Sequence, residues 1–294
     1  MPAVLEELIE LLALERASED TFIGQSQDLG WGTVFGGQVL GQALSAAQQT
    51  APDDRAVHSM HGYFLRPGDV AAPIEYQVDR IRDGRSFTTR RVVAMQHGKA
   101  IFNLAASFQI EESGRDHQDA RPDAPGPDGW MSERELALKF VDIIPARLRQ
   151  RAISERPIEI RPVEPVNPMQ PTARPPRKYV WMRAAGTLGD DAALHRYLLA
   201  YASDFHFLPT ALHPHALSWM TRGLQLASLD HAIYFHRPFR FDEWMLYAID
   251  SPSASGARGL VRGQIFDREG RLIASCTQEG LMRERGDAPP RGDQ

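Results

Sequence analysis

Three polar residues in the second half of the chain stand among apolar neighbours: Asp204, Ser228 and Gln278. Asp204 lies in the segment Tyr-Ala-Ser-Asp-Phe-His-Phe-Leu-Pro (201–209), directly after a stretch with helical periodicity. A carboxylate in such surroundings needs hydrogen-bond partners, or its pKa rises. Ser228 and Gln278 each share the apolar alternation of a strand-like segment. A carboxylate, a hydroxyl and an amide on one helix and two strands of the same unit can converge at one point.

Spacing alone assigns no role to these residues. Taken singly, each has an ordinary structural explanation: Asp204 can cap a helix or form an ion pair, Ser228 can be a tolerated small residue, and Gln278 can be a polar residue at a sheet edge. The residues themselves therefore leave both interpretations open.

Several common catalytic motifs do not occur in the sequence. No serine lies in a G-x-S-x-G motif, and neither a phosphate-binding P-loop nor an H-E-x-x-H zinc motif is present. Gly30-Trp31-Gly32 does not continue to the third glycine of a dinucleotide-binding motif. His58 and His61, if they lie on a strand, point to opposite faces because they are three residues apart. We therefore expect no metal and no other cofactor.

Composition and charge exclude further classes of protein. The 294 residues carry a formal net charge of −5 and no block of lysine or arginine, so we expect neither nucleic acid nor an anionic membrane as a partner. No apolar run approaches the length of a membrane span, and the N-terminus does not have the pattern of a signal peptide. Cys276 is the single cysteine, which excludes an internal disulfide. We expect a reducing, cytoplasmic location.

Proline placement divides the chain into two structured blocks. Seven prolines lie in the twenty residues from Pro157 to Pro176 inclusive, and neither a regular helix nor a central strand tolerates that density. We expect a first unit with a leading helix over 1–111, a proline-rich connection with its own helix at 132–150 over 112–178, a second unit over 179–285, and a tail over 286–294.

The two blocks contain their elements in the same order. The first has a helical stretch at 35–49 and strand-like segments at 57–65, 74–82, 86–96 and 100–108; in the second, a helical stretch opens 192–212, and the strand-like segments are 224–236, 244–251, 259–266 and 272–282. Phe64-Leu65-Arg66-Pro67 matches Phe235-His236-Arg237-Pro238, and the spacing from this arginine to the glycine of a later hairpin is 32 residues in the first block and 33 in the second. The pattern predicts an internal duplication in an α+β fold, with an antiparallel sheet around each helix.

Around these repeated segments and the polar residues Asp204, Ser228 and Gln278, the sequence closely resembles the bacterial acyl-CoA thioesterase II family. The matching segments run through nearly the whole chain and include 24–26, 28–30, 34–39, 57–59, 63–69, 201–204, 229–231, 235–239, 257–259 and 278–280. The resemblance implies the fold of that family, the double hotdog, in which two tandem helix-wrapped antiparallel sheets form one continuous sheet.

The resemblance also implies an activity and site residues. It implies hydrolysis of acyl-CoA thioesters, of medium to long chain, to free fatty acid and CoA, by a water that an Asp, a Thr or Ser and a Gln hold. These fall on Asp204, Ser228 and Gln278. The bacterial pattern has threonine where this chain has Ser228, so the methyl group that stiffens the rotamer is lost. We align Phe35-Gly36-Gly37 with Asp204 and expect no second complete site in the first half. A homo-oligomer is expected.

Two other functions stay open. A hydratase or dehydratase of 3-hydroxyacyl thioesters on the same fold would need an Asp/His pair, and His206 lies close to Asp204 in the sequence. A protein that binds acyl-CoA without catalysis would need neither residue. The CoA contacts are not assigned: the basic residues in matching segments, each equally able to form a structural ion pair, are Arg66, Arg237, Arg258 and Arg262.

Overall fold

The computed structural model describes residues 1–285, and the tail predicted over 286–294 lies outside the described residues. Its strands form one 13-stranded antiparallel sheet in the order β1-β2-β4-β5-β6-β3-β10-β13-β12-β11-β8-β7, with β9 paired to β13. The strands are β1 (Glu15–Arg16), β2 (Thr21–Gly24), β3 (Arg55–Phe64), β4 (Ile74–Asp83), β5 (Phe87–Gln96), β6 (Lys99–Ile110), β7 (Ile158–Pro162), β8 (Arg177–Ala184), β9 (Leu224–Ser228), β10 (Asp230–Phe235), β11 (Met245–Ser255), β12 (Arg258–Phe266) and β13 (Leu272–Glu284). The helices are α1 (Ala3–Leu12), α2 (Gly36–Gln48), α3 (Glu133–Lys139), α4 (Ala146–Ile153) and α5 (Ala192–Ser203), with 3-10 helices η1 (Pro127–Gly129), η2 (Val141–Ile143) and η3 (Leu208–His215).

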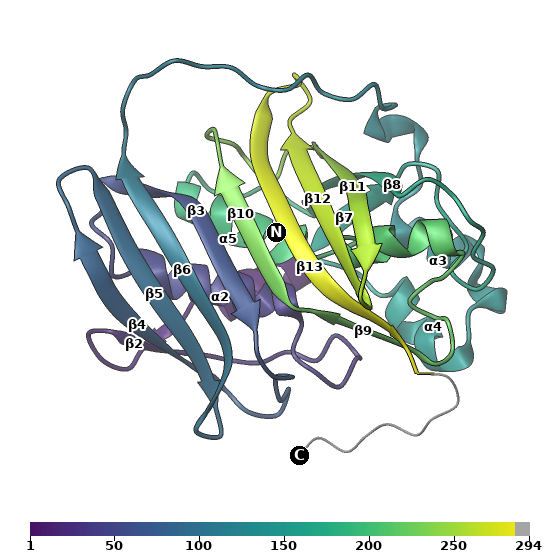
Figure 1. Cartoon of the computed structure of the whole chain (residues 1–294), viewed down its shortest axis with the longest axis horizontal. Helices are drawn as coiled ribbons and strands as arrows, with labels where there is room; N and C mark the ends of the chain where they lie inside the picture. The colour runs from purple at the N-terminus through teal and green to yellow at the C-terminus, as the bar shows by residue number, and fades with distance from the viewer. Residues whose placement is uncertain (286–294) are drawn as a thin grey trace.

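The two halves of the sheet join where β3 pairs with β10. Each half contributes one long helix to the same side of the sheet, α2 from the first half and α5 from the second (Figure 1). One continuous antiparallel sheet around two central helices confirms the double hotdog expected from the sequence.

Equivalent hydrogen bonds recur in the two halves. The guanidinium group of Arg66, after β3, donates to the carbonyl oxygen of Ala100 at 2.6 Å. The guanidinium group of Arg237, after β10, donates to the carbonyl oxygen of Leu272 at 2.7 Å. β3 therefore corresponds to β10 with an offset of 171 residues, and β6 corresponds to β13 with an offset of 172. This common register supports the internal duplication.

The two central helices run antiparallel and touch at glycines of α2. Gly37 lies against the carbonyl oxygen of Tyr201, and Gly41, one turn later, lies against that of Tyr197. A side chain at Gly37 would overlap this oxygen, so only glycine permits the two backbones to approach so closely. The contact brings the end of α5 to the beginning of α2.

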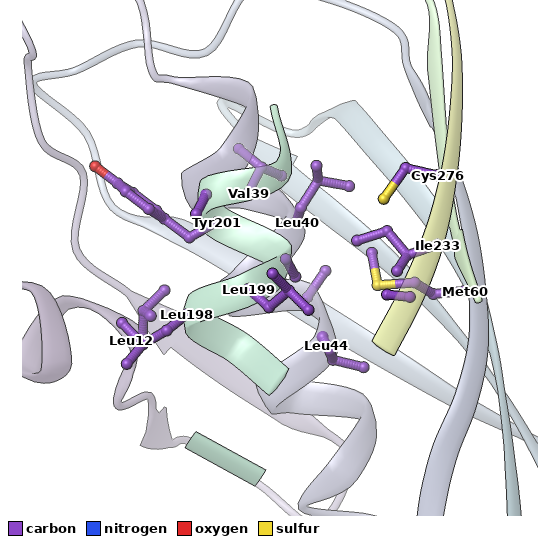
Figure 2. Packing of buried hydrophobic residues seen from close by; sticks show 14 of the residues in the cluster. Leu12, Val39, Leu40, Leu44, Met60, Leu198, Leu199, Tyr201, Ile233 and Cys276 are labelled. Carbon is purple, nitrogen blue, oxygen red and sulfur yellow. The ribbon is translucent and has the colours of Figure 1, made fainter. Parts of the chain in front are cut away.

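Buried apolar side chains fill the space between the helices and the sheet. Leu40 and Leu44 of α2 and Leu199 of α5 lie close to Met60 of β3 and Ile233 of β10 (Figure 2). All five are at most 2% exposed. Burial of this apolar surface is the main contribution to the stability of the fold.

The connection contains two short helices, and the single helix expected over 132–150 is wrong. Ser132 caps α3 by accepting from the Glu135 N–H, while the Glu135 carboxylate accepts from the Ser132 N–H. Pro145 stands directly before α4, where its missing N–H costs nothing but where it prevents one continuous helix. The strand expected over 224–236 is also divided, into β9 and β10, at Leu229.

We predict that Gly37→Ala lowers the free energy of unfolding by about 1–3 kcal/mol, the usual cost of overpacking. A glycine-to-alanine change inside a helix ordinarily stabilises the helix. A lower free energy of unfolding would therefore come from the contact between the helices and not from helix propensity. Gly189→Ala is the control, because a Cβ there meets no atom within 4 Å. Urea unfolding followed by circular dichroism measures both. A Gly37→Ala protein as stable as the wild type would contradict the close contact.

Candidate active site

Asp204 is the residue that ends α5, in the C-cap position. Its carboxylate lies beside the first turn of α2: a Cβ on Gly36 would be 2.7 Å from Asp204 Oδ2. The Gly37 N–H donates a hydrogen bond to the carboxylate. Since the N-terminus of a helix is the positive end of its dipole, this position suits an anion.

Ser228 and Gln278 lie at the same spot. Ser228 is the last residue of β9 and stands opposite Gly280 on β13, so that Gln278 follows two residues away on the same face of β13. The Gln278 side-chain NH₂ donates to the Ser228 hydroxyl oxygen at 2.7 Å, and both side chains also hydrogen bond to the Asp204 carboxylate. The structure therefore brings all three candidate residues together from a helix and two strands.

Opposing effects act on the Asp204 carboxyl. Burial raises the pKa of Asp204, while the nearby His231 and hydrogen bonds from Gln278, Gly37 and Ser228 lower it, and burial prevails. A carboxylate with a raised pKa is a stronger base than an ordinary aspartate, and it suits a group that accepts a proton.

His231 belongs to this cluster, although the sequence analysis assigned it no role. Its Nδ1 lies 2.5 Å from Gln278 Oε1 and its Nε2 lies 2.9 Å from Ser203 Oγ. The histidine and Ser203 are completely buried, and burial lowers the pKa of His231. The signal in the sequence was a histidine that alternates with Ile233 and Phe235 on the apolar face of a strand.

His206 does not form a pair with Asp204. Its Nδ1 lies 2.6 Å from Lys178 Nζ and its Nε2 lies 3.0 Å from Glu133 Oε1. Its backbone is in the left-handed region, with φ at 64°. Both ring nitrogens are therefore engaged by β8 and by α3 of the connection. The Asp/His pair that a hydratase would need is not formed by these two residues.

The first half carries a different set of residues at the equivalent positions. Val57 stands opposite Phe108 as Ser228 stands opposite Gly280, and the offsets of 171 and 172 residues equate Met60 with His231 and Ala106 with Gln278. Our alignment of 35–37 with Asp204 is wrong: these residues begin α2, whereas Asp204 ends α5. The equivalent of Asp204 is Gln49, the C-cap residue of α2. Residues 35–37 instead lie against Asp204 in space.

The four arginines in the matching segments all have partners within the chain. Arg66 and Arg237 donate to carbonyl oxygens, as described above. Arg237 also pairs with Asp116, Arg258 pairs with Glu279 at 2.9 Å, and Arg262 pairs with Asp250 at 2.6 Å. These contacts favour structural roles for them.

Two further properties concern the described part of the chain. Residues 1–285 contain no group of three or more His, Cys, Asp or Glu side chains that could hold a metal ion. Over the same range, no helix is long and apolar enough to cross a membrane.

Known proteins are similar to this chain over nearly its full length. The family described as acyl-CoA thioesterase matches residues 147–281, and the acyl-CoA thioesterase N-terminal domain matches residues 26–109. Acyl-CoA thioesterase 2 of Haemophilus influenzae is 45% identical, with 96% of this chain and 99% of that protein covered. Acyl-coenzyme A thioesterase 8 of Homo sapiens is 42% identical, with 93% and 88% covered. The crystal structure of acyl-CoA thioesterase II TesB2 from Mycobacterium marinum has a TM-score of 0.77 at 41% identity, with 94% and 98% covered.

The joined helix-wrapped sheets, with a carboxylate, a hydroxyl and an amide together at the end of one helix, define a double-hotdog protein of the thioesterase class. Within this class, the similarity over nearly the whole length shows that the chain belongs to the acyl-CoA thioesterase family.

We predict that kcat/KM for an acyl-CoA falls on the acid side with a midpoint above 3.8, the ordinary value for an aspartate side chain. A role of Asp204 as proton acceptor requires its carboxylate form, and burial raises its pKa. Activity should therefore be complete above the raised pKa and be lost as the pH falls through it. Rates from pH 3 to 8, with circular dichroism at each pH to show that the fold persists, test this. A midpoint at or below 3.8 would contradict it.

Proposed function

We propose that this chain hydrolyses acyl-CoA thioesters to free fatty acid and CoA with a water held by Asp204, Ser228 and Gln278. One observation carries the proposal: a partly buried carboxylate shares hydrogen bonds with an amide and a hydroxyl at the beginning of a helix. These groups accept and donate the hydrogen bonds that orient a water molecule. A set of this kind needs no covalent intermediate.

The reaction suits this small set of groups. Asp204 accepts a proton from the water while the water oxygen attacks the thioester carbonyl carbon. The positive end of the α2 dipole stabilises the negative charge that develops on the carbonyl oxygen. The C–S bond then breaks, and the thiolate takes the proton from Asp204. A thiol has a pKa of about 8.5, so the thiolate leaves without a strong general acid.

The surroundings of Asp204 support acyl chains of medium to long length. Phe35 stacks on Phe205 with ring centroids 4.5 Å apart, and Phe64 lies beside Gly36. An apolar wall stabilises an acyl chain in proportion to the surface it buries. Hydrolysis rates for acyl-CoAs from four to eighteen carbons test this preference, and a maximum at four carbons would contradict it.

We also propose a homo-oligomer in the cytoplasm. The free thiol of Cys276 is buried, and burial raises its pKa to about 12, which agrees with a reduced cysteine. Tyr63 and Tyr234 are 51% and 49% exposed on β3 and β10, where the outer face of the sheet offers a contact surface. Analytical ultracentrifugation measures the oligomeric state, and a monomer at micromolar concentration would contradict the proposal.

The experiment that tests the function combines palmitoyl-CoA with a thiol reagent and measures free CoA. A hydrolase releases CoA at each turnover. Incubation with a 2-enoyl-CoA tests the rival hydratase, which would consume the enoyl group and release no CoA. A protein that only binds acyl-CoA would change neither. Either of the last two results would overturn the proposed function.

We predict that Asp204→Asn lowers kcat for palmitoyl-CoA by roughly 10²–10⁴-fold, the usual effect of a positioned acid or base. The amide keeps the shape of the carboxylate and cannot accept the proton, so binding of the intact thioester should persist. Steady-state kinetics and calorimetric binding measure the two effects. If a folded Asp204→Asn protein retains more than about a tenth of the wild-type kcat, Asp204 has only a structural role.

Ser228 and Gln278 should differ in their contributions. Gln278→Ala should lower kcat about as much as Asp204→Asn with little change in Kd for the thioester, because it removes an orienting group. Ser228→Ala should lose less, since a water can occupy the site of the hydroxyl. Ser228→Thr keeps the hydroxyl and restricts its rotamer, so kcat should be unchanged or higher. A larger loss for Ser228→Thr than for Ser228→Ala would contradict this ranking.

A further inference from the structure

We propose that His231 is a positioning residue for Gln278: it holds the amide oxygen of Gln278 away from Asp204, so that the amide NH₂ group faces Ser228 and Asp204. This inference rests on the proposed function, since it concerns the groups that hold the water.

The contacts of His231 leave it few alternatives. It lies on β10 beside β13, next to the pair formed by Ala232 and Thr277. Nδ1 is 2.5 Å from Gln278 Oε1, and Nε2 is 2.9 Å from Ser203 Oγ. His231 and Ser203 are 0% exposed and Gln278 is 1% exposed, so solvent does not compete for these bonds.

The direction of the hydrogen bonds follows from Asp204. Ser203 does not decide which imidazole nitrogen carries the proton, because its hydroxyl can donate to Nε2 or can accept from Nε2 while donating to the Ala200 carbonyl oxygen at 2.9 Å. The amide can in principle lie either way round. An amide oxygen turned toward Asp204 would set two acceptors against each other without a proton between them. The favourable arrangement therefore has Nδ1–H donating to Oε1.

Successive hydrogen bonds then connect His231 to the Asp204 carboxylate. His231 Nδ1–H donates to Gln278 Oε1, and the Gln278 NH₂ group donates to the Ser228 oxygen at 2.7 Å and to Asp204. The Ser228 hydroxyl proton is thus free to point to Asp204 or to the water. Without the Nδ1–H group, the amide can rotate and present its oxygen to Ser228 and Asp204.

The first half of the chain gives independent support. The positions equivalent to Ser228, His231 and Gln278 are Val57, Met60 and Ala106. The same fold therefore accepts methionine at the position of His231 where the amide is also missing. The strand position does not itself require a histidine, and the histidine occurs in the half that also has the glutamine.

The test is a double-mutant cycle on the full-length protein with palmitoyl-CoA as substrate. His231→Met introduces the residue that the first half carries. We expect kcat to fall roughly 10- to 100-fold, the scale of a misplaced catalytic group, with KM within twofold of the wild type. In the Gln278→Ala background the same change should alter kcat by less than twofold. His231→Asn, whose side-chain NH₂ can donate near the place of Nδ1, should restore kcat to within about fivefold.

His231→Leu, which matches His231→Asn in shape and has no donor, replaces His231→Met if thermal unfolding shows that the methionine protein is not folded. Two results would overturn the inference: an unchanged kcat for the donor-free variant beside a large loss for Gln278→Ala, or an equal loss for the donor-free variant with and without Gln278. Full activity of Gln278→Ala is a different result, which would overturn the proposed water site and the inference with it.

Discussion

The contact between the α2 glycines Gly37 and Gly41 and the backbone of α5 determines where the Asp204 carboxylate lies. Gly37 and Gly41 allow the two helices to meet at backbone distance, in opposite directions. The C-cap of α5 therefore reaches the positive end of α2, which lies beside Asp204. A bulkier residue at Gly37 would separate the helices and move the carboxylate away from the backbone N–H group that donates to it.

The polar cluster around Asp204 persists in an apolar core because its members satisfy one another. A buried polar group without a partner costs about 1–3 kcal/mol, and here the amide of Gln278 bonds to both His231 and Ser228. The first half shows the alternative solution: Met60 and Ala106 stand in place of the histidine and glutamine, so these two positions need no hydrogen-bond partners. The fold therefore forms in both halves, and only the second half carries this polar cluster.

The connection between the halves is part of the environment of the site. Glu133 of α3 bonds to His206, two residues after Asp204, and His206 bonds in turn to Lys178 of β8. Burial alone would raise the pKa of Glu133, but the contact with His206 and the nearby charges of Arg156 and Lys178 lower it to about 2. Burial lowers the pKa of Lys178 to about 8. These partly buried contacts hold the turn that follows α5 against the sheet and the connection.

The sequence by itself determined the elements whose patterns are local. Alternation and helical periodicity predicted α2, β4 and β5 closely, because the side-chain period depends only on neighbouring residues. The matching arginine segments predicted the duplication, and the resemblance to a family supplied Asp204, Ser228 and Gln278 as a set. Where a local rule was misjudged, as at Pro145, the predicted element was wrong.

Tertiary structure decided which residues meet. His231 and Gln278 are 47 residues apart, and Asp204 and Gly36 are further apart still. Such contacts depend on strand order and on the distance between two helices, neither of which has a local pattern. The misplaced equivalence of 35–37 with Asp204 was corrected in the same way. Only the packed structure shows that 35–37 begins α2 and touches Asp204, whereas the residue equivalent to Asp204 is the C-cap of α2.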